Sequence, residues 1–104
     1  MDGHGSLKYY RRMDGNNFIS VRMAQLKAYT SASIPISTKA LGERNATMPN
    51  GPYLGVPDIV LLEGGLPIIT QDGQHIGSIG ISGASTDFDG ICAQAGIDAV
   101  SSEL

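Results

Sequence analysis

The sequence predicts a single α+β domain in which an antiparallel sheet packs against helices. Two stretches, residues 18–33 and the last twenty residues, show the 3.6-residue spacing of apolar side chains that is typical of helices. Between them lie short apolar runs joined by brief turns, and short connections favour antiparallel pairing of strands. A length of 104 residues allows one domain with one hydrophobic core.

The first predicted element is a strand in the segment GSLKYYRR, residues 5–12. Leu7 and Tyr9 point to one side and the residues between them to the other, which is the two-residue period of a strand. The turn residues of MDGNN follow, and one of its asparagines is expected to cap the next helix.

The segment FISVRMAQLKAYTSAS, residues 18–33, is predicted to be a helix. Ala24, Ala28 and Ala32 form a stripe of small side chains along it. We expect this stripe to lie against the sheet, because little bulk then separates the two backbones. Pro35 ends the helical pattern.

One further helical turn is expected in STKAL, with Ser37 or Thr38 as its cap. Residues 43–57 contain glycine, proline and asparagine without a clear period. Since this segment also carries several apolar side chains and little charge, we expect an ordered loop.

The second half of the sheet is predicted from residues 59–82. Short strands are expected at 59–62 and 66–70, with a bulge or sharp bend at Gly64 and Gly65 between them. The dipeptide DG at 72–73 is a strong hairpin signal, so HIGSIGIS is expected to be the returning strand.

A last helix is expected after Ser85 or Thr86, either of which is a suitable cap. Its apolar residues recur at helical spacing, and we expect them to be buried against the sheet. This predicted buried stripe consists of Phe88, Ile91, Cys92, Ala95 and Ala99.

Composition and charge exclude several classes of partner. The net charge is −3 and no basic cluster of useful size is present, which argues against nucleic acid and anionic membrane surfaces. No stretch is long enough to span a bilayer, and the N-terminus lacks the apolar run of a secretory signal. A single cysteine cannot form an internal disulfide. We therefore expect a cytoplasmic protein.

Several segments, taken in order, resemble the GlcG/HbpS-like family of heme-binding and heme-degrading-type domains, which includes the C-terminal domain of PduO-type proteins. The resemblance rests on the opening DGHGSL, then RRMDG, MAQLKAYTSAS, STKAL, EGGLPI and IGSIGISGAS, followed by Asp89 and AQAG. Together these pieces cover nearly the whole chain, so residues 1–104 are identified as one such domain.

The resemblance implies a profilin-like antiparallel sheet with flanking helices, and assembly into homo-oligomers. Family members usually have a helix and an apolar strand before the glycine turn, and this sequence lacks them. Either the sheet has lost a strand, or the sequence is a piece of a longer chain. A lost strand would expose backbone groups that a partner chain would have to cover.

The resemblance also implies heme as the cofactor, and His4 is the candidate ligand of the heme iron. It stands in the glycine turn DGHG, where a flat macrocycle could approach closely. The alternative is a solvated turn histidine. His75 follows the hairpin turn and is expected to face solvent.

Other candidate cofactor-binding residues surround the predicted helix and turns. Lys27 could meet a heme propionate or a substrate carboxylate; alternatively, it snorkels from the helix edge into water. The glycine turns could form the walls of the site, or they could serve dense packing alone. These turn residues are Gly64, Gly65, Pro67, Ser82 and Gly83.

The candidate proton-transfer groups are Asp14, Lys27 and Asp89. For both aspartates the alternative is helix capping. Cys92 is expected to be a buried structural thiol, and the sequence has neither zinc-type ligand spacing nor a phosphate loop.

Three functions remain open at this level. The first is a binding module for heme or a related tetrapyrrole, with slow degradation of it as a further activity. The second is a cofactor-independent enzyme that acts on a small oxygenated metabolite in the same pocket. The third is a structural accessory protein that forms homo-oligomers.

Overall fold

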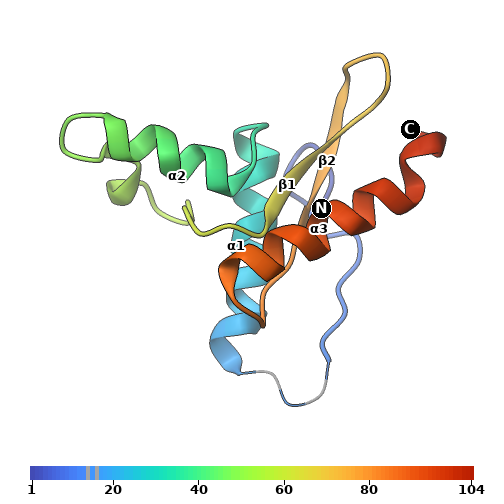
Figure 1. Cartoon of the computed structure of the whole chain (residues 1–104), viewed down its shortest axis with the longest axis horizontal. Helices are drawn as coiled ribbons and strands as arrows, with labels where there is room; N and C mark the ends of the chain where they lie inside the picture. The colour runs from blue at the N-terminus through green and yellow to red at the C-terminus, as the bar shows by residue number, and fades with distance from the viewer. Residues whose placement is uncertain (14, 16) are drawn as a thin grey trace.

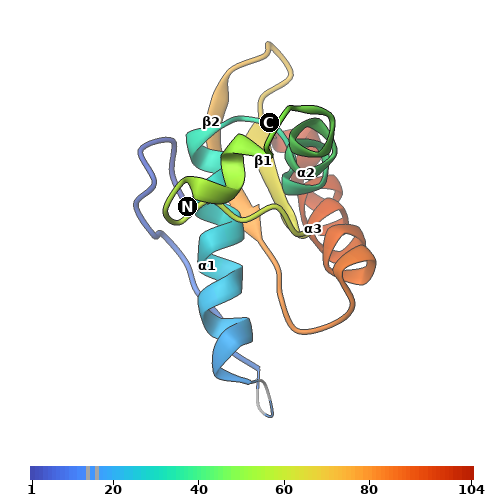
Figure 2. The same cartoon turned by 90° about the vertical axis from the view of Figure 1, so that its left-hand side faces the viewer.

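The computed structural model describes residues 1–13, 15 and 17–104. In these described residues, three α-helices and one antiparallel hairpin form a compact domain, which confirms the predicted α+β class. The elements are α1 (Phe18–Ser33), α2 (Thr38–Thr47), β1 (Gly65–Ile69), β2 (His75–Gly80) and α3 (Thr86–Val100), with short 3₁₀ turns at Pro52–Gly55 and Ser101–Glu103. The hairpin lies between α1 on one side and α3 on the other (Figures 1 and 2).

The hairpin forms as predicted, and its register explains how a proline fits into β1. Leu66 pairs with Ile79, and Pro67 pairs with Ser78. The N–H and C=O groups of Ser78 turn away from β1 and bond to Met1 instead, so the N–H that proline lacks is not needed in the ladder. By the alternation of an antiparallel ladder, the N–H and C=O of Gly80 face this same outer edge of β2.

Helix α1 has the bounds that the sequence predicts, and its small-residue stripe faces the hairpin. Ala28 and Ala32 are 6% and 7% exposed. The approach to β2 is so close that a Cβ atom added to Gly80 would lie 2.6 Å from the backbone nitrogen of Ala28. The predicted packing of this stripe is therefore confirmed.

Helix α2 begins where predicted but is longer. The hydroxyl of Ser37 accepts a hydrogen bond from the N–H of Ala40 at 3.0 Å, which is the expected N-cap. The helix then continues to Thr47, so the first part of the loop predicted at 43–57 is helical. The fully buried Leu41 anchors the helix, and the Asn45 side chain bonds the backbone of the 3₁₀ turn that follows.

Two predicted strands are wrong. Residues 5–12 form no strand; the outer edge of β2 instead makes one isolated bridge, between its Gly77 and Asp2. Residues 59–62 also form no strand. There, the N–H of Val60 donates to the Thr30 hydroxyl at 2.9 Å, so a side chain of α1 satisfies a backbone group that a strand partner would otherwise bond.

The predicted buried stripe of α3 is also wrong. Its members are exposed: Phe88 by 59%, Ile91 by 61%, and also Cys92, Ala95 and Ala99. The residues of α3 that are buried are Asp89 and Ala93, which lie one turn apart on another face. On this inward face, Asp89 pairs with Lys27 of α1 at 3.0 Å, a long-range contact that apolar spacing within α3 cannot reveal.

Candidate functional site

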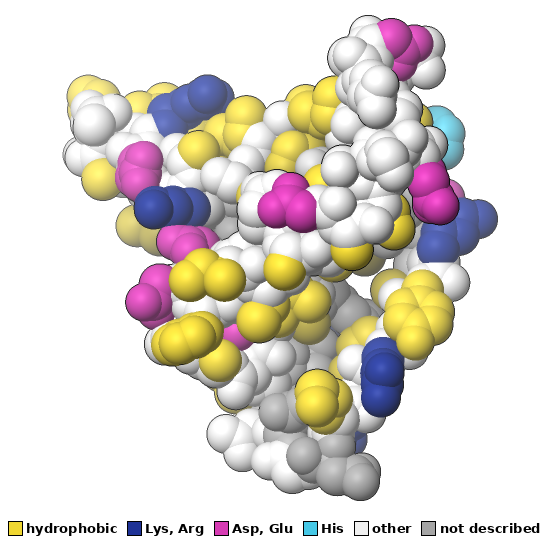
Figure 3. Space-filling model, turned by 45° about the vertical axis from the view of Figure 1, so that its right-hand side comes forward, with side chains coloured by type: hydrophobic (Ala, Val, Ile, Leu, Met, Phe, Trp, Pro, Cys, Tyr) yellow, Lys and Arg dark blue, Asp and Glu magenta, His cyan; other side chains and the backbone are white. Residues whose placement is uncertain are grey.

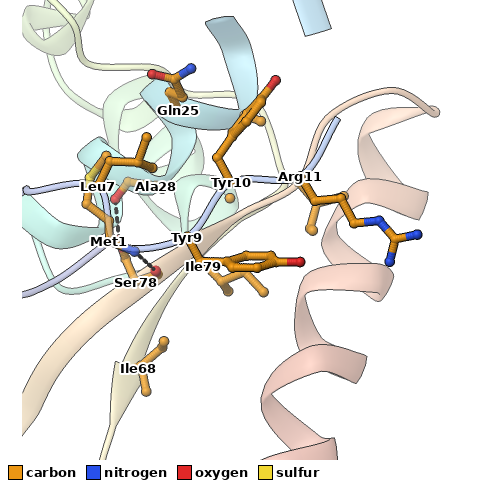
Figure 4. Close-up of a pocket in the computed structure, with 13 residues that line it drawn as sticks. Met1, Leu7, Tyr9, Tyr10, Arg11, Gln25, Ala28, Ile68, Ser78 and Ile79 are labelled. Carbon is orange, nitrogen blue, oxygen red and sulfur yellow. Dashed lines mark hydrogen bonds between the residues drawn. The ribbon is translucent and has the colours of Figure 1, made fainter. Parts of the chain in front are cut away.

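A cavity of about 340 Å³ lies along the outer edge of β2. The extended segment before α1 forms one wall and α1 itself another (Figure 4). Figure 3 shows the molecule from a side on which many hydrophobic side chains reach the surface. Most of the cavity lining is apolar, contributed by Leu7, Ala24, Ala28, Ile68, Ile79 and Ile81.

The extended segment supplies the aromatic and cationic side chains of the cavity. Tyr9, Tyr10 and Arg11 all line it. Because neighbouring residues of an extended chain point in opposite directions, Tyr9 and Arg11 reach the same way, while Tyr10 points away from them. Figure 4 shows the Tyr9 ring beside Ile79 and the Arg11 side chain extended toward the ribbon of α3.

Hydrogen bonds join Met1, β2 and α1 beside the cavity. The Met1 ammonium donates to the carbonyl oxygen of Ser78 at 3.0 Å, and the N–H of Ser78 donates to the carbonyl oxygen of Met1 at 2.9 Å. The Ser78 hydroxyl in turn donates to the carbonyl oxygen of Ala28. These bonds join the terminus, β2 and α1 at one point.

A smaller polar hollow of about 30 Å³ adjoins the cavity. It shares Tyr10, Arg11 and Ala24 with the larger space. Arg12, Ser20, Val21 and Ser82 complete its lining. The two spaces together offer an apolar chamber with a polar recess at one end.

Lys27 and Asp89 form a buried ion pair next to this region. Their side chains are 2% and 3% exposed, and the Lys27 Nζ lies 3.0 Å from the Asp89 Oδ2. The same Nζ donates to the carbonyl oxygen of Ile81, and the Asp89 Oδ1 accepts from the N–H of Ala84. The pair therefore ties the end of β2 and the start of α3 to α1.

The glycine turn at 64–65 encloses this lysine. A Cβ atom on Gly64 would lie 2.9 Å from the Lys27 Nζ, and one on Gly65 would clash with the Lys27 backbone. Gly64 also has a φ of 138°, which favours glycine. The structure thus brings Lys27, both glycines and Asp89 into contact with one another. None of the four lines the cavity.

The chain matches the family described as haem degrading protein HbpS-like over residues 1–98. This chain belongs to the HbpS-like family. Among curated proteins, it is similar to an uncharacterized 15.0 kDa protein of Citrobacter freundii from the dhaT-dhaS intergenic region. The two are 29% identical over 106 residues, which cover 97% of this chain and 72% of the relative.

Two solved structures share the fold of this HbpS-like chain. The crystal structure of HbpS is 34% identical, with a TM-score of 0.84, over 95% of this chain and 69% of that one. The crystal structure of a PduOC:heme complex is 30% identical, with a TM-score of 0.83, over 94% of this chain and 72% of that one. The resemblance seen in the sequence motifs is confirmed.

The predicted iron ligand, His4, lies in an exposed turn and is not among the residues that line either space. The turn is organised by Asp2, whose Oδ1 accepts from the N–H groups of His4 and Ser6. These two bonds hold the pKa of Asp2 below its ordinary value, and the bond from Ser6 has the larger effect. A role for His4 in binding stays a prediction.

The other predicted site residues fall in several places. Ser82 lines the small hollow, Gly83 is exposed with a φ of 134°, and Pro67 lies within β1. Asp14 lies outside the described residues. His75 is partly buried, contrary to expectation, and its Nε2 has no hydrogen-bond partner among the described residues.

Local hydrogen bonds lower the pKa of two described carboxylates, Asp2 in the N-terminal turn and Asp87 in α3. Neither belongs to a cluster of metal-ligating side chains among the described residues. At α3, bonds from the Ser85 side chain and then from the Asp87 backbone lower the pKa of Asp87. The described residues contain no group of three or more metal-ligating side chains and no helix able to cross a membrane.

Sequence reasoning missed the lining residues Tyr9 and Arg11 as site candidates. The signal was present, since two tyrosines followed by two arginines stand out in a chain with few aromatic or charged residues. That cluster becomes meaningful once the fold places it across from Ile79 and Ile81.

Proposed function

We propose that this chain binds heme, or a related tetrapyrrole, in the cavity along β2. The observation that carries the proposal is the apolar chamber with aromatic walls, in a fold shared with a heme-bound structure. A volume of about 340 Å³ lies within the range of small-molecule sites. Apolar walls with a few polar groups are the usual surroundings of such ligands.

The flat and apolar side chains of the lining support a planar macrocycle as the ligand. Tyr9 and Ile79 lie beside each other, and Ile68 and Ala28 contribute further apolar surface (Figure 4). Bound iron would supply redox chemistry to the site. Tyrosine is a known axial ligand of heme iron, so Tyr9 and Tyr10 join His4 as candidates for that role.

Slow degradation of the bound group is the enzymatic extension of this proposal, and the description of the family supports testing it. The alternative, a cofactor-independent enzyme, has less support from the geometry. Two of its three candidate proton-transfer groups, Lys27 and Asp89, bond to each other in the interior. Neither lines the cavity.

The test is a titration of the chain with hemin, followed by absorbance. We expect a shifted Soret band that saturates at one hemin per chain. Tyr9→Ala removes an aromatic wall and should weaken binding by about three- to tenfold. Leu54→Ala is the matched control, because Leu54 is 76% exposed and lies outside the cavity.

The His4→Ala variant tests the ligand role predicted from the sequence. An unchanged Soret position in this variant, together with a changed one in Tyr9→Ala or Tyr10→Ala, would assign the iron to a tyrosine. A parent chain that leaves the spectrum of hemin unchanged would refute heme binding.

We also propose that copies of the chain associate with one another. The support is the apolar face of α3, where Phe88 and Ile91 are more than half exposed. Such a face is typical of a surface that another protein covers. A second copy would bury the same face by symmetry, since two-fold contacts are self-complementary.

A further inference from the structure

The lysine and arginine side chains of the chain differ in whether a carboxylate lies next to them. Four lysine and arginine side chains lie 3.0–3.8 Å from a carboxylate oxygen. Arg12 stacks on the ring of Phe18, 5.9 Å from its centroid. Among the described residues, Arg11 and Arg44 have no such carboxylate partner. Although the chain has a net charge of −3, the cation Arg11 lines the cavity without a carboxylate beside it among the described residues, so it is available to a ligand.

Arg11 stands where the apolar cavity meets the polar hollow, since it lines both. Its neighbours in the hollow include Ser20 and Ser82, and none of the hydrogen bonds among the described residues uses either hydroxyl. An acidic group in the hollow could therefore accept from a guanidinium and from two hydroxyls. The larger chamber offers mainly apolar side chains.

We infer that the ligand of this cavity is a flat apolar molecule with a carboxylate, and that Arg11 binds this carboxylate in the hollow. The inference rests on the proposed function and narrows the ligand class to amphipathic acids. For a tetrapyrrole, the carboxylate is that of a propionate side chain. A planar guanidinium can donate two parallel hydrogen bonds to a carboxylate, and a neutral ester loses most of this attraction.

The test uses iron-free protoporphyrin IX and its dimethyl ester, because both lack the metal and differ in the acidic groups alone. Binding is followed by porphyrin fluorescence and absorbance for the parent, Arg11→Gln and Arg44→Gln. The Arg44 side chain is exposed in the last turn of α2, outside both spaces, and serves as the matched control.

We expect the parent to bind the free acid more tightly than the ester. Arg11→Gln should weaken binding of the acid by about three- to tenfold and leave that of the ester unchanged, since Arg11 is exposed and partly screened by water. Arg44→Gln should match the parent with both compounds. Higher salt concentration should weaken binding of the free acid more than binding of the ester.

The outcomes separate this inference from the proposed function. Equal binding of acid and ester by the parent, or an unchanged acid affinity in Arg11→Gln, would overturn the role of Arg11 even if hemin binds. A parent that binds neither hemin nor protoporphyrin IX would overturn the proposed function itself. If Arg11→Gln lost its fold, judged by circular dichroism, the acid-to-ester ratio of the parent would still decide the ligand class.

Discussion

At the residue scale, the buried pair of Lys27 and Asp89 has the largest structural consequences. Both side chains are almost fully enclosed, and each makes a second hydrogen bond, to Ile81 and from Ala84 respectively. Burying two charges is costly, and their attraction compensates when the remaining polar groups are satisfied. In this structure the pair lies on the face of α3 that turns inward.

The pair can be tested by a double-mutant cycle with Lys27→Met and Asp89→Leu. Each single change leaves an uncompensated buried charge and should lower the free energy of unfolding by about 3–5 kcal/mol. The loss of unfolding free energy in the double variant should be smaller than the sum of the two single losses. We expect this difference to exceed about 1 kcal/mol. Urea unfolding measures all four free energies.

A second ion pair provides the control for this cycle. Lys39 and Glu63 lie 3.7 Å apart, and the Lys39 side chain is 62% exposed. Lys39→Met should therefore change the free energy of unfolding by less than about 1 kcal/mol. Strictly additive losses in the Lys27 and Asp89 cycle would contradict the coupling described here.

At the element scale, the close packing of α1 on β2 depends on small residues from both sides. Ala28 faces Gly80, and a side chain at either position has little room. Protein interiors are packed densely, so even one added methyl group must displace its neighbours. The stripe that the sequence shows on α1 has its counterpart in Gly80 of β2.

Gly80→Ala tests this packing directly. Its Cβ would meet backbone atoms of Ala24 and Ala28, which cannot move as a flexible side chain would. We expect the free energy of unfolding to fall by about 1–3 kcal/mol, as measured in urea. The control is Gly55→Ala, since a Cβ there has no atom within 4 Å. A Gly80→Ala variant as stable as the control would show that α1 and β2 are farther apart.

At the scale of the whole molecule, the exposed apolar face of α3 and the partly open edge of β2 both favour association. The radius of gyration is 13.2 Å, and few large apolar side chains are fully buried in the described residues. Small domains bury a limited fraction of their surface, so the proposed partner copy would add stability beyond that of the core.

Sedimentation of the purified chain at micromolar concentration tests the assembly. We expect a dimer or larger species that Ile91→Lys shifts toward the monomer, because a charge on the apolar face of α3 must be desolvated on contact. Thr47→Lys, at an exposed position of α2, should leave the sedimentation unchanged. A folded monomeric parent would defeat the assembly proposal.

Much of the fold follows from local pattern. The spacing of apolar residues predicts α1 to the residue, and the dipeptide DG at 72–73 predicts the hairpin between β1 and β2. Ser37 caps α2 as its side chain leads one to expect. These features depend on interactions between residues close in the chain, which is why a sequence alone reveals them.

The features that required the tertiary structure all depend on contacts between distant residues. Lys27 and Asp89 are 62 positions apart, and the face of α3 that carries Asp89 turns inward, while Phe88 and Ile91 face outward. Likewise, Arg11 lines the cavity because the fold brings β2 opposite it. The sequence by itself determined the family, the main helix and the hairpin. Long-range packing and charge pairing decided which faces are buried and where a ligand could bind.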